Sequence, residues 1–209
     1  MANVSKNTKA TINETINTDA KMNIKTIILG ITGSIAAYKS ADIANNLAKL
    51  QYDVHAVMTK AGASFITPLT LQALTKNRVF VDVLQEDDPA KIIHIALPEK
   101  ADMLLIAPAT ANIIAKIAAG IADDMLSSMV LAVHDIPKII APAMNTRMYE
   151  NPATQENLQT LIRRGWTVIE PREARLACGY VGKGALAEVK TILDSVEGIF
   201  VGTQKKERG

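Results

Sequence analysis

The residues with the clearest chemical potential lie between Ala141 and Pro152, in the run Ala-Pro-Ala-Met-Asn-Thr-Arg-Met-Tyr-Glu-Asn-Pro. Asn145 carries an amide that can donate and accept hydrogen bonds, and Met144 and Met148 add polarisable apolar surface. One polar group in an apolar frame can orient a small molecule. The same pattern is expected of a proline-rich loop whose asparagine caps a helix and whose methionines fill the core. The local sequence leaves both interpretations open.

Three titratable side chains outside this run are further candidates. Cys178 is the only cysteine, and it lies in a glycine-rich segment that continues through Gly182 and Gly184. Such a segment suits a flap on which an exposed thiol can react, although a lone cysteine is often inert packing. His94 can act as an acid or base near neutral pH, or serve only as a structural hydrogen-bonding group. Lys183, on the same glycine-rich segment, can meet an anionic substrate group or remain in solvent.

Composition indicates one soluble globular domain and argues against several partners. The 209 residues are 48% hydrophobic, and 23 Lys and Arg against 21 Asp and Glu give a net charge of +2. No basic stripe occurs and only 4% of the residues are aromatic, which argues against nucleic-acid binding. No apolar run reaches the ~20 residues of a membrane span, and the N-terminus lacks the apolar segment of a signal peptide. We therefore expect a cytoplasmic protein that binds neither nucleic acid nor membrane.

Strands and helices are predicted to alternate along the chain. Apolar runs predict strands at 24–29, 54–58, 79–81, 101–107, 138–140 and 166–169. Helical spacing predicts helices at 35–50, 65–74, 110–119, 123–133, 154–164 and 188–200. This alternation predicts a single α/β domain with a doubly wound, mostly parallel sheet of the Rossmann or flavodoxin-like type. We expect this domain at 23–200, between a disordered arm at 1–22 and a flexible tail at 201–209.

The turn after the first predicted strand suits a phosphate, because Gly33 and Ser34 lie where a helix begins. It lacks the three glycines of a dinucleotide motif and the Gly-Lys-Ser/Thr of a P-loop. The second strand leads into Thr59 and Lys60, whereas Asp53 lies near its beginning, so no carboxylate is placed to bind the ribose of NAD. A mononucleotide such as FMN fits better. Glycines at such a turn are also used only for close packing.

A second turn, Ala107 to Asn112, follows the strand predicted at 101–107. Its small side chains would let a flat ring lie against the backbone, and Thr110 and Asn112 offer hydrogen bonds. Small residues here also suit tight packing. Because the carboxyl ends of parallel strands meet at one edge of a sheet, we expect both turns and Asn145 to converge there.

Five features taken together resemble the flavin-dependent cysteine decarboxylases. They are Gly-Ser-Ile-Ala-Ala-Tyr-Lys at 33–39, His94, Ala-Pro-Ala-Thr-Ala-Asn at 107–112, Pro-Ala-Met-Asn-Thr-Arg-Met at 142–148, and Ala-Cys-Gly-Tyr-Val-Gly-Lys-Gly at 177–184. They occur in the order of the family, and the similarity extends over residues 24–199. Two positions depart from its pattern: Tyr149 replaces a tryptophan, and Tyr180 stands where an acidic residue is common.

The resemblance implies FMN as cofactor and decarboxylation of phosphopantothenoylcysteine to phosphopantetheine in coenzyme A biosynthesis. In the scheme of the family, His94 is the acid or base partner of the substrate, Asn145 holds the substrate carboxylate, and Cys178 donates a proton. The substrate would contact Ala143, Met144, Asn145 and Lys183. FMN would contact Gly33, Ser34, Ile35, Thr59, Lys60, Pro108, Thr110, Ala111, Asn112 and Ala143.

Chemistry accounts for the flavin. The substrate cysteine is acylated on nitrogen, so it cannot form the Schiff base through which pyridoxal phosphate stabilises a carbanion. Oxidation of the cysteine side chain to a thioaldehyde places the carboxylate β to a C=S group. Loss of CO2 then gives a stabilised ene-thiolate, and its reduction leaves no net redox change.

Four other functions share parts of this pattern. A decarboxylase of a peptidyl C-terminal cysteine uses the same chemistry, and a flavin prenyltransferase is not expected to carry the Pro-Ala-Met-Asn motif. A non-catalytic, FMN-binding regulatory subunit tends to have an acidic tail, whereas this tail carries Lys205, Lys206 and Arg208. A flavodoxin-like electron carrier would not need His94 and Cys178 together with the asparagine motif.

The resemblance also implies self-association into a homo-oligomer built from trimers. FMN would then lie near a subunit contact, and His94 would serve its own flavin or that of a neighbour. Both a stand-alone decarboxylase and the first half of a bifunctional decarboxylase and ligase are consistent with the sequence.

Overall fold

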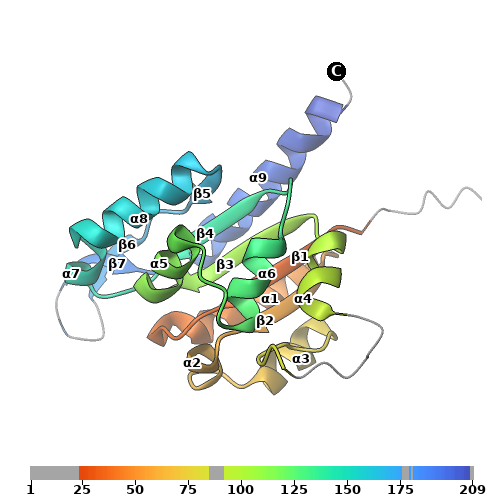
Figure 1. The fold of residues 1–209 in the computed structure, drawn as a ribbon, viewed down its shortest axis with the longest axis horizontal. Coiled ribbons are helices and arrows are strands. Elements are labelled where there is room, and N and C mark those ends of the chain that lie inside the picture. Colours follow the sequence, from red (N-terminus) through yellow and green to blue (C-terminus); the bar gives the residue numbers. More distant parts are fainter. Residues whose placement is uncertain (1–23, 85–91, 176–178, 180, 208–209) are drawn as a thin grey trace, which may run out of the picture.

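A five-stranded parallel sheet forms the centre of the computed structural model, which describes residues 24–84, 92–175, 179 and 181–207. The strands are β1 (Thr26–Ile31), β2 (Asp53–Met58), β3 (Met103–Ala109), β4 (Lys138–Pro142) and β5 (Trp166–Val168). Their spatial order is β2-β1-β3-β4-β5, so the winding reverses between β1 and β3 (Figure 1). The predicted doubly wound α/β architecture is confirmed, and the point of reversal is where such sheets bind ligands.

Helices follow the strands on both faces of the sheet. They are η1 (Ile35–Tyr38), α1 (Lys39–Lys49), α2 (Lys60–Ala63), α3 (Pro68–Thr75), α4 (Ile93–Ala96), η2 (Pro98–Lys100), α5 (Ala111–Ala119), α6 (Met125–Ala132), α7 (Thr146–Tyr149), α8 (Pro152–Arg163) and α9 (Val189–Glu207). An antiparallel ribbon of β6 (Arg172–Arg175) and β7 (Val181–Ala185) lies between β5 and α9. No helix within the described ranges is long and apolar enough to cross a membrane.

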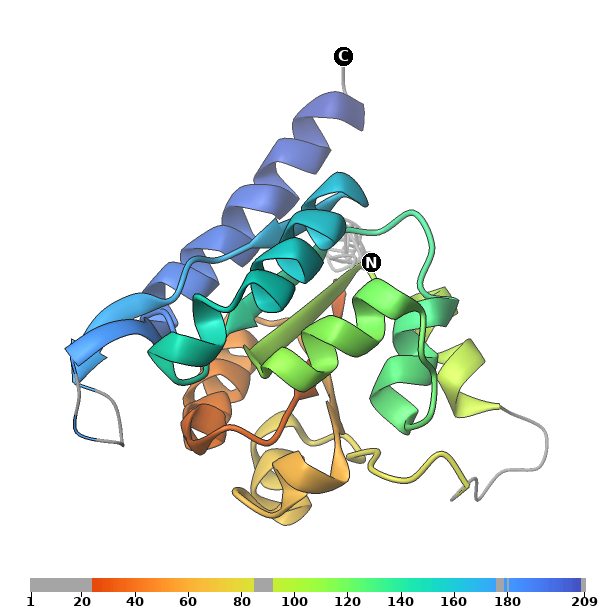
Figure 2. The ribbon, with the colours of Figure 1, turned by 60° about the vertical axis from the view of Figure 1, so that its left-hand side comes forward.

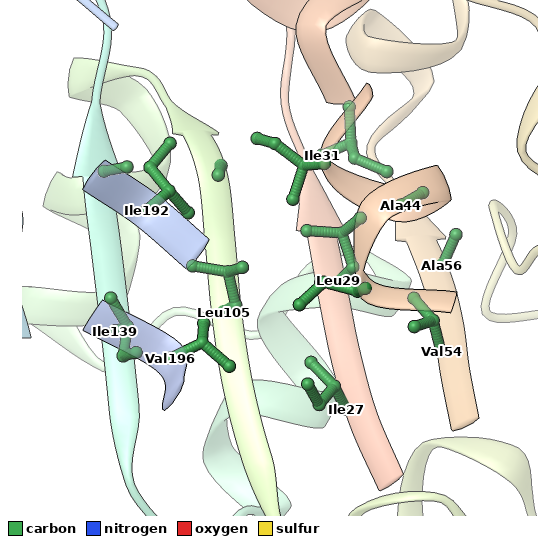
Figure 3. Packing of buried hydrophobic residues seen from close by; sticks show 14 of the residues in the cluster. Ile27, Leu29, Ile31, Ala44, Val54, Ala56, Leu105, Ile139, Ile192 and Val196 are labelled. Carbon is green, nitrogen blue, oxygen red and sulfur yellow. The ribbon is translucent and has the colours of Figure 1, made fainter. Parts of the chain in front are cut away.

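Alternating strand residues divide the core into two layers, because successive side chains of a strand point to opposite faces. Ile27 and Leu29 of β1 pack in one layer with α1 and with Ile192 of α9, as Figure 3 shows. Ile28 between them belongs to the other layer, which contains α5, α6 and Leu158 of α8. Figure 2 shows α5, α6 and α8 together on one side of the sheet, with α1 and α9 on the other. All seven residues of β3 are buried, as expected of a central parallel strand.

Three of the predicted elements differ clearly from the structure. The strand predicted at 79–81 is reduced to a single bridge between Val57 and Phe80. The helix predicted from residue 65 begins at Pro68, because Thr67 caps it and proline is favoured in the first turn. Helix α9 continues to Glu207, through residues expected to form a flexible tail. The division into an arm at 1–22, a domain at 23–200 and a tail stays a prediction.

Candidate active site

The carboxyl ends of the central strands open into a cavity of about 480 Å³, here called the first cavity. It is lined by Gly33, Ser34 and Ile35 after β1, by Thr110 after β3, and by Ala143, Met144 and Asn145 at the end of β4. Residues of the β6–β7 ribbon complete the lining. A cavity of this volume is typical of small-molecule sites. The three segments expected to converge therefore do so.

A second cavity of about 620 Å³ adjoins the first. Gly33, Thr110 and Met148 line both, so the two cavities meet at the ends of β1 and β3. The predicted residues Thr59, Lys60 and Asn112 line the second cavity. The Lys60 ammonium is 3.6 Å from a carboxylate oxygen of Asp82 and its side chain is 80% exposed, so it remains available to an anion.

Hydroxyl side chains cap the helix that follows each of three strands. Ser34 accepts a hydrogen bond from Ala36 N (3.3 Å), Thr59 from Gly62 N (3.0 Å), and Thr110 from Ile113 N (3.3 Å). A hydroxyl that accepts in this way still has a proton to donate. These caps therefore combine a structural role with the capacity to bind a phosphate oxygen.

Thr32 joins the first turn to the second. Its Oγ1 donates to the Pro108 carbonyl at 2.7 Å and accepts from Thr110 N at 3.0 Å, and the residue is 1% exposed. Ser40 makes a similar buried bond from α1 to the Ala107 carbonyl at 2.9 Å. Sequence analysis did not single out Thr32 or Ser40. The sequence feature that could have indicated Thr32 is its position directly after a strand, where its hydroxyl can hydrogen-bond to backbone groups of the neighbouring strand.

Asn145 caps a helix and also lines the first cavity. Its Oδ1 accepts a hydrogen bond from Arg147 N at 2.9 Å, which caps α7, and the residue also lines the first cavity. Met144 and Ala143 line the same cavity, and Met148 lines both cavities. The cap fixes the orientation of the amide, so the side chain is held at the cavity by the helix that follows it.

The β6–β7 ribbon packs on the asparagine motif through two glycines. Gly184 has φ of 153°, its carbonyl accepts from Met144 N at 2.9 Å, and a Cβ on it would overlap the Met144 carbonyl oxygen. A Cβ on Gly182 would come within 2.5 Å of Thr146 Oγ1. Close approach is possible only without side chains at these positions. The ribbon itself was not predicted, since its sequence is polar or glycine-rich and lacks an apolar alternation.

Tyr149, Glu170 and Lys183 form a polar cluster beside the ribbon. The Tyr149 hydroxyl donates to Glu170 Oε2 at 2.8 Å, and the Lys183 ammonium lies 2.5 Å from the same oxygen and 5.5 Å from the centre of the Tyr149 ring. Burial, with the Glu170 carboxylate as the next cause, raises the pKa of Tyr149 to about 12. The bond from Lys183, together with that from Tyr149, outweighs burial and lowers the pKa of Glu170. Lys183 lines neither cavity.

Three more of the predicted residues line neither cavity, and a fourth lies outside the described residues. His94 is on α4, which packs against α6, and it lines neither cavity. Pro108 and Ala111 also line neither; Pro108 instead accepts the bond from Thr32. Cys178 lies outside the described residues, as does Tyr180, between the two strands of the ribbon.

A family model described as Flavoprotein matches residues 15–201. The chain belongs to the flavoprotein family. This flavoprotein is 52% identical over 174 residues to the "Probable phosphopantothenoylcysteine decarboxylase" of Streptococcus mutans, covering 83% of this chain and 97% of that relative. It is 43% identical over 179 residues to the coenzyme A biosynthesis bifunctional protein of Bacillus subtilis, covering 86% of this chain. It spans only 44% of the length of that bifunctional relative.

Solved structures of flavoproteins share its fold. A mutant PPC decarboxylase complexed with pantothenoylaminoethenethiol is 33% identical, with a TM-score of 0.77 over 85% of this chain and 98% of that one. The FMN-dependent cysteine decarboxylase SpaF is 31% identical, with a TM-score of 0.72 over 83% of this chain and 94% of that one.

Proposed function

We propose that this flavoprotein is an FMN-dependent carboxy-lyase that converts phosphopantothenoylcysteine to phosphopantetheine in coenzyme A biosynthesis. The carrying observation is the pair of joined cavities where the sheet reverses, lined by the glycine-serine, small-residue and asparagine motifs. The 52% identity to a relative of that name over 97% of its length supports the choice of substrate. The likeness to a PPC decarboxylase with a bound pantothenoyl compound supports it further. The substrate and its pathway favour a cytoplasmic enzyme.

The residues around the cavities fit FMN. Ser34, Thr59 and Thr110 each have a hydroxyl proton that can reach a phosphate or ribityl oxygen, and Ile35 and Ala143 give an apolar wall for a flat ring. The remaining FMN contacts that we propose are Gly33, Lys60 and Asn112, with Pro108 and Ala111 shaping the turn. When bound, FMN supplies a reversible two-electron acceptor, which an N-acylated cysteine needs before it loses CO2.

Asn145 would bind the substrate carboxylate, with Ala143 and Met144 beside it. A neutral amide orients the carboxylate without a salt bridge. This matters because the carboxylate becomes neutral CO2, so a cation there would stabilise the ground state more than the transition state. Cys178 would donate the proton that the ene-thiolate carbon takes up as the product forms.

His94 would act at the site of a neighbouring subunit in a homo-oligomer built from trimers. Two observations support this placement. His94 lines neither cavity of its own chain. Three apolar side chains near it in the chain or on the adjoining α6 are exposed, namely Ile92 at 54%, Ile95 at 41% and Leu131 at 49%. Exposed apolar residues gathered in this way suit a subunit contact.

An absorbance spectrum of the purified protein, followed by turnover, tests the proposed function. We expect a flavin spectrum and the release of CO2 and phosphopantetheine from phosphopantothenoylcysteine. A yellow protein that accepts only a peptide ending in cysteine would move the function to peptide decarboxylation. A yellow protein without turnover would indicate a regulatory subunit, and a protein that cannot bind FMN would exclude the proposal.

Replacing Asn145 with aspartate tests the carboxylate site. A second carboxylate would repel the substrate, so Asn145→Asp is expected to retain FMN and lose at least about a hundredfold in kcat/KM. Asn151→Asp is the matched control, because Asn151 caps α8 through the same bond, Oδ1 to Ala153 N at 3.0 Å, and lines neither cavity. Full turnover by Asn145→Asp would show that Asn145 does not bind the substrate carboxylate.

Replacing Cys178 with serine tests the proposed proton donor. For Cys178→Ser we expect CO2 release with a low yield of reduced product.

A further inference from the structure

The first cavity carries a group of three cations that the decarboxylation itself does not use. Lys39 at the start of α1 and Arg172 and Arg175 of β6 all line it, and none of its described lining residues is acidic. The second cavity differs, because Lys60 and Lys116 there are accompanied by Asp82, Asp123 and Asp124. Among the two cavities, only the first is lined by cations without an acidic lining residue among those described.

We propose that Arg175, with Arg172 and Lys39, binds the phosphate group of the substrate; this inference rests on the proposed function. The phosphate carries a charge of about −1.5 to −2 at neutral pH and offers three strong acceptor oxygens. Arginine matches such oxygens with two parallel N–H groups. The site thereby distinguishes phosphorylated from dephosphorylated pantothenoylcysteine.

The ion pairs of the described residues leave Lys39 and Arg175 for an external anion. Arg172 Nε donates to the Leu186 carbonyl at 3.2 Å and lies 3.0 Å from Glu188 Oε1, which holds its side chain in place and offsets part of its charge. Within the described part of the chain, no carboxylate lies at ion-pair distance from Lys39 or Arg175. Lys39 and Arg175 therefore share the first cavity with no paired carboxylate of their own among the described residues, and a bound phosphate would offset the repulsion between the cations.

The irregular β6–β7 ribbon brings two arginines three residues apart to one cavity. Regular strand residues at that spacing point to opposite faces. Here the register between β6 and β7 shifts after Arg172, which pairs with Ala185 while Glu173 pairs with Lys183, so Gly184 is an extra residue. Such a bulge bends and twists a ribbon. Both arginines line the first cavity.

The substrate has two anionic groups, a carboxylate and a phosphate, and its chemistry indicates which of them binds to the cations of the first cavity. Its carboxylate is lost as CO2, so cations bound to it would oppose the reaction, whereas the phosphate does not change and can supply binding energy from a distance. Lys183 is the other cation predicted for the phosphate, but it pairs with Glu170 and lines neither cavity. The phosphate role is therefore assigned to the residues of β6 and α1.

The test compares steady-state turnover of phosphopantothenoylcysteine and pantothenoylcysteine. For the wild type we expect kcat/KM to be at least about tenfold higher with the phosphorylated substrate, since a charge-assisted bond changes binding by about this factor or more. Arg175→Gln should raise KM for the phosphorylated substrate about tenfold more than for the other, with kcat and the flavin spectrum little changed. Arg175→Lys should recover part of the difference, and Lys39→Gln should act in the same direction.

Arg163→Gln is the matched control, because Arg163 lies on α8, bonds Thr160 Oγ1 at 2.9 Å and lines neither cavity. Equal losses on both substrates in Arg175→Gln, or no loss, would overturn the phosphate assignment. A wild type that uses both substrates equally well would also overturn it while leaving the decarboxylase intact. A wild type active on neither would overturn the proposed function and this inference with it.

Discussion

The bridge made by Thr32 allows a quantitative prediction for Thr32→Val. Valine has nearly the shape of threonine, but it leaves the Pro108 carbonyl and Thr110 N without their partner. Each buried group left unsatisfied costs about 1–3 kcal/mol, so for the two groups we expect a loss of about 2–6 kcal/mol in the free energy of unfolding. That is a large part of the ~5–15 kcal/mol of a typical domain. FMN binding should weaken as well, because Thr110 would no longer be held against the first turn.

Urea unfolding followed by the fluorescence of Trp166 measures this loss. Trp166 is the only tryptophan, and it is 7% exposed. All variants are compared at one protein concentration, because self-association shifts apparent stability. Thr32→Ser keeps the hydroxyl and should lose only about 1 kcal/mol for the missing methyl. Ser40→Ala removes one buried bond to one carbonyl and should lie between the two. Thr32→Val no less stable than Thr32→Ser would refute the bridging role.

Two further predictions concern the ribbon and its polar cluster. Gly184→Ala should disrupt the contact of β7 with Met144 and therefore lower kcat/KM. Gly198→Ala is the control, because Gly198 is exposed in α9 and a Cβ there would meet no atom within 4 Å. Denaturation of this control should show a free energy of unfolding raised by about 0.5–1 kcal/mol. The pKa of Tyr149 is raised from 10.0 to about 12 in the folded protein, so its stabilising contribution is complete below pH 10 and lost as pH rises through about 12. The difference in free energy of unfolding between wild type and Tyr149→Phe should therefore decrease to zero over that pH range. The absorbance change of a phenolate forming near pH 12 should be missing from the variant. A difference in free energy that does not depend on pH would contradict this prediction.

Much of the fold follows from local patterns that were visible in the sequence. Strand β3 is a continuous apolar run because it is buried on both faces, and α5 starts at a threonine cap and ends at Gly120, which has φ of 72°. Since all strands of the main sheet are parallel, their carboxyl ends share one edge, and the convergence of Ser34, Thr110 and Asn145 follows from that rule. The sequence by itself thus determined the architecture and the convergence of Ser34, Thr110 and Asn145 at the first cavity.

Only the tertiary structure decided the remaining parts of the site. The β6–β7 ribbon has no apolar alternation, and it is held by contacts of Gly182 and Gly184 with a segment far away in the sequence. The cations Arg172 and Arg175 come to the first cavity with it, while Lys183 pairs with Glu170. Thr32 acquires its role only because β3 ends beside β1. In each case the deciding energy is a contact between distant segments, which propensity and spacing along the chain do not contain.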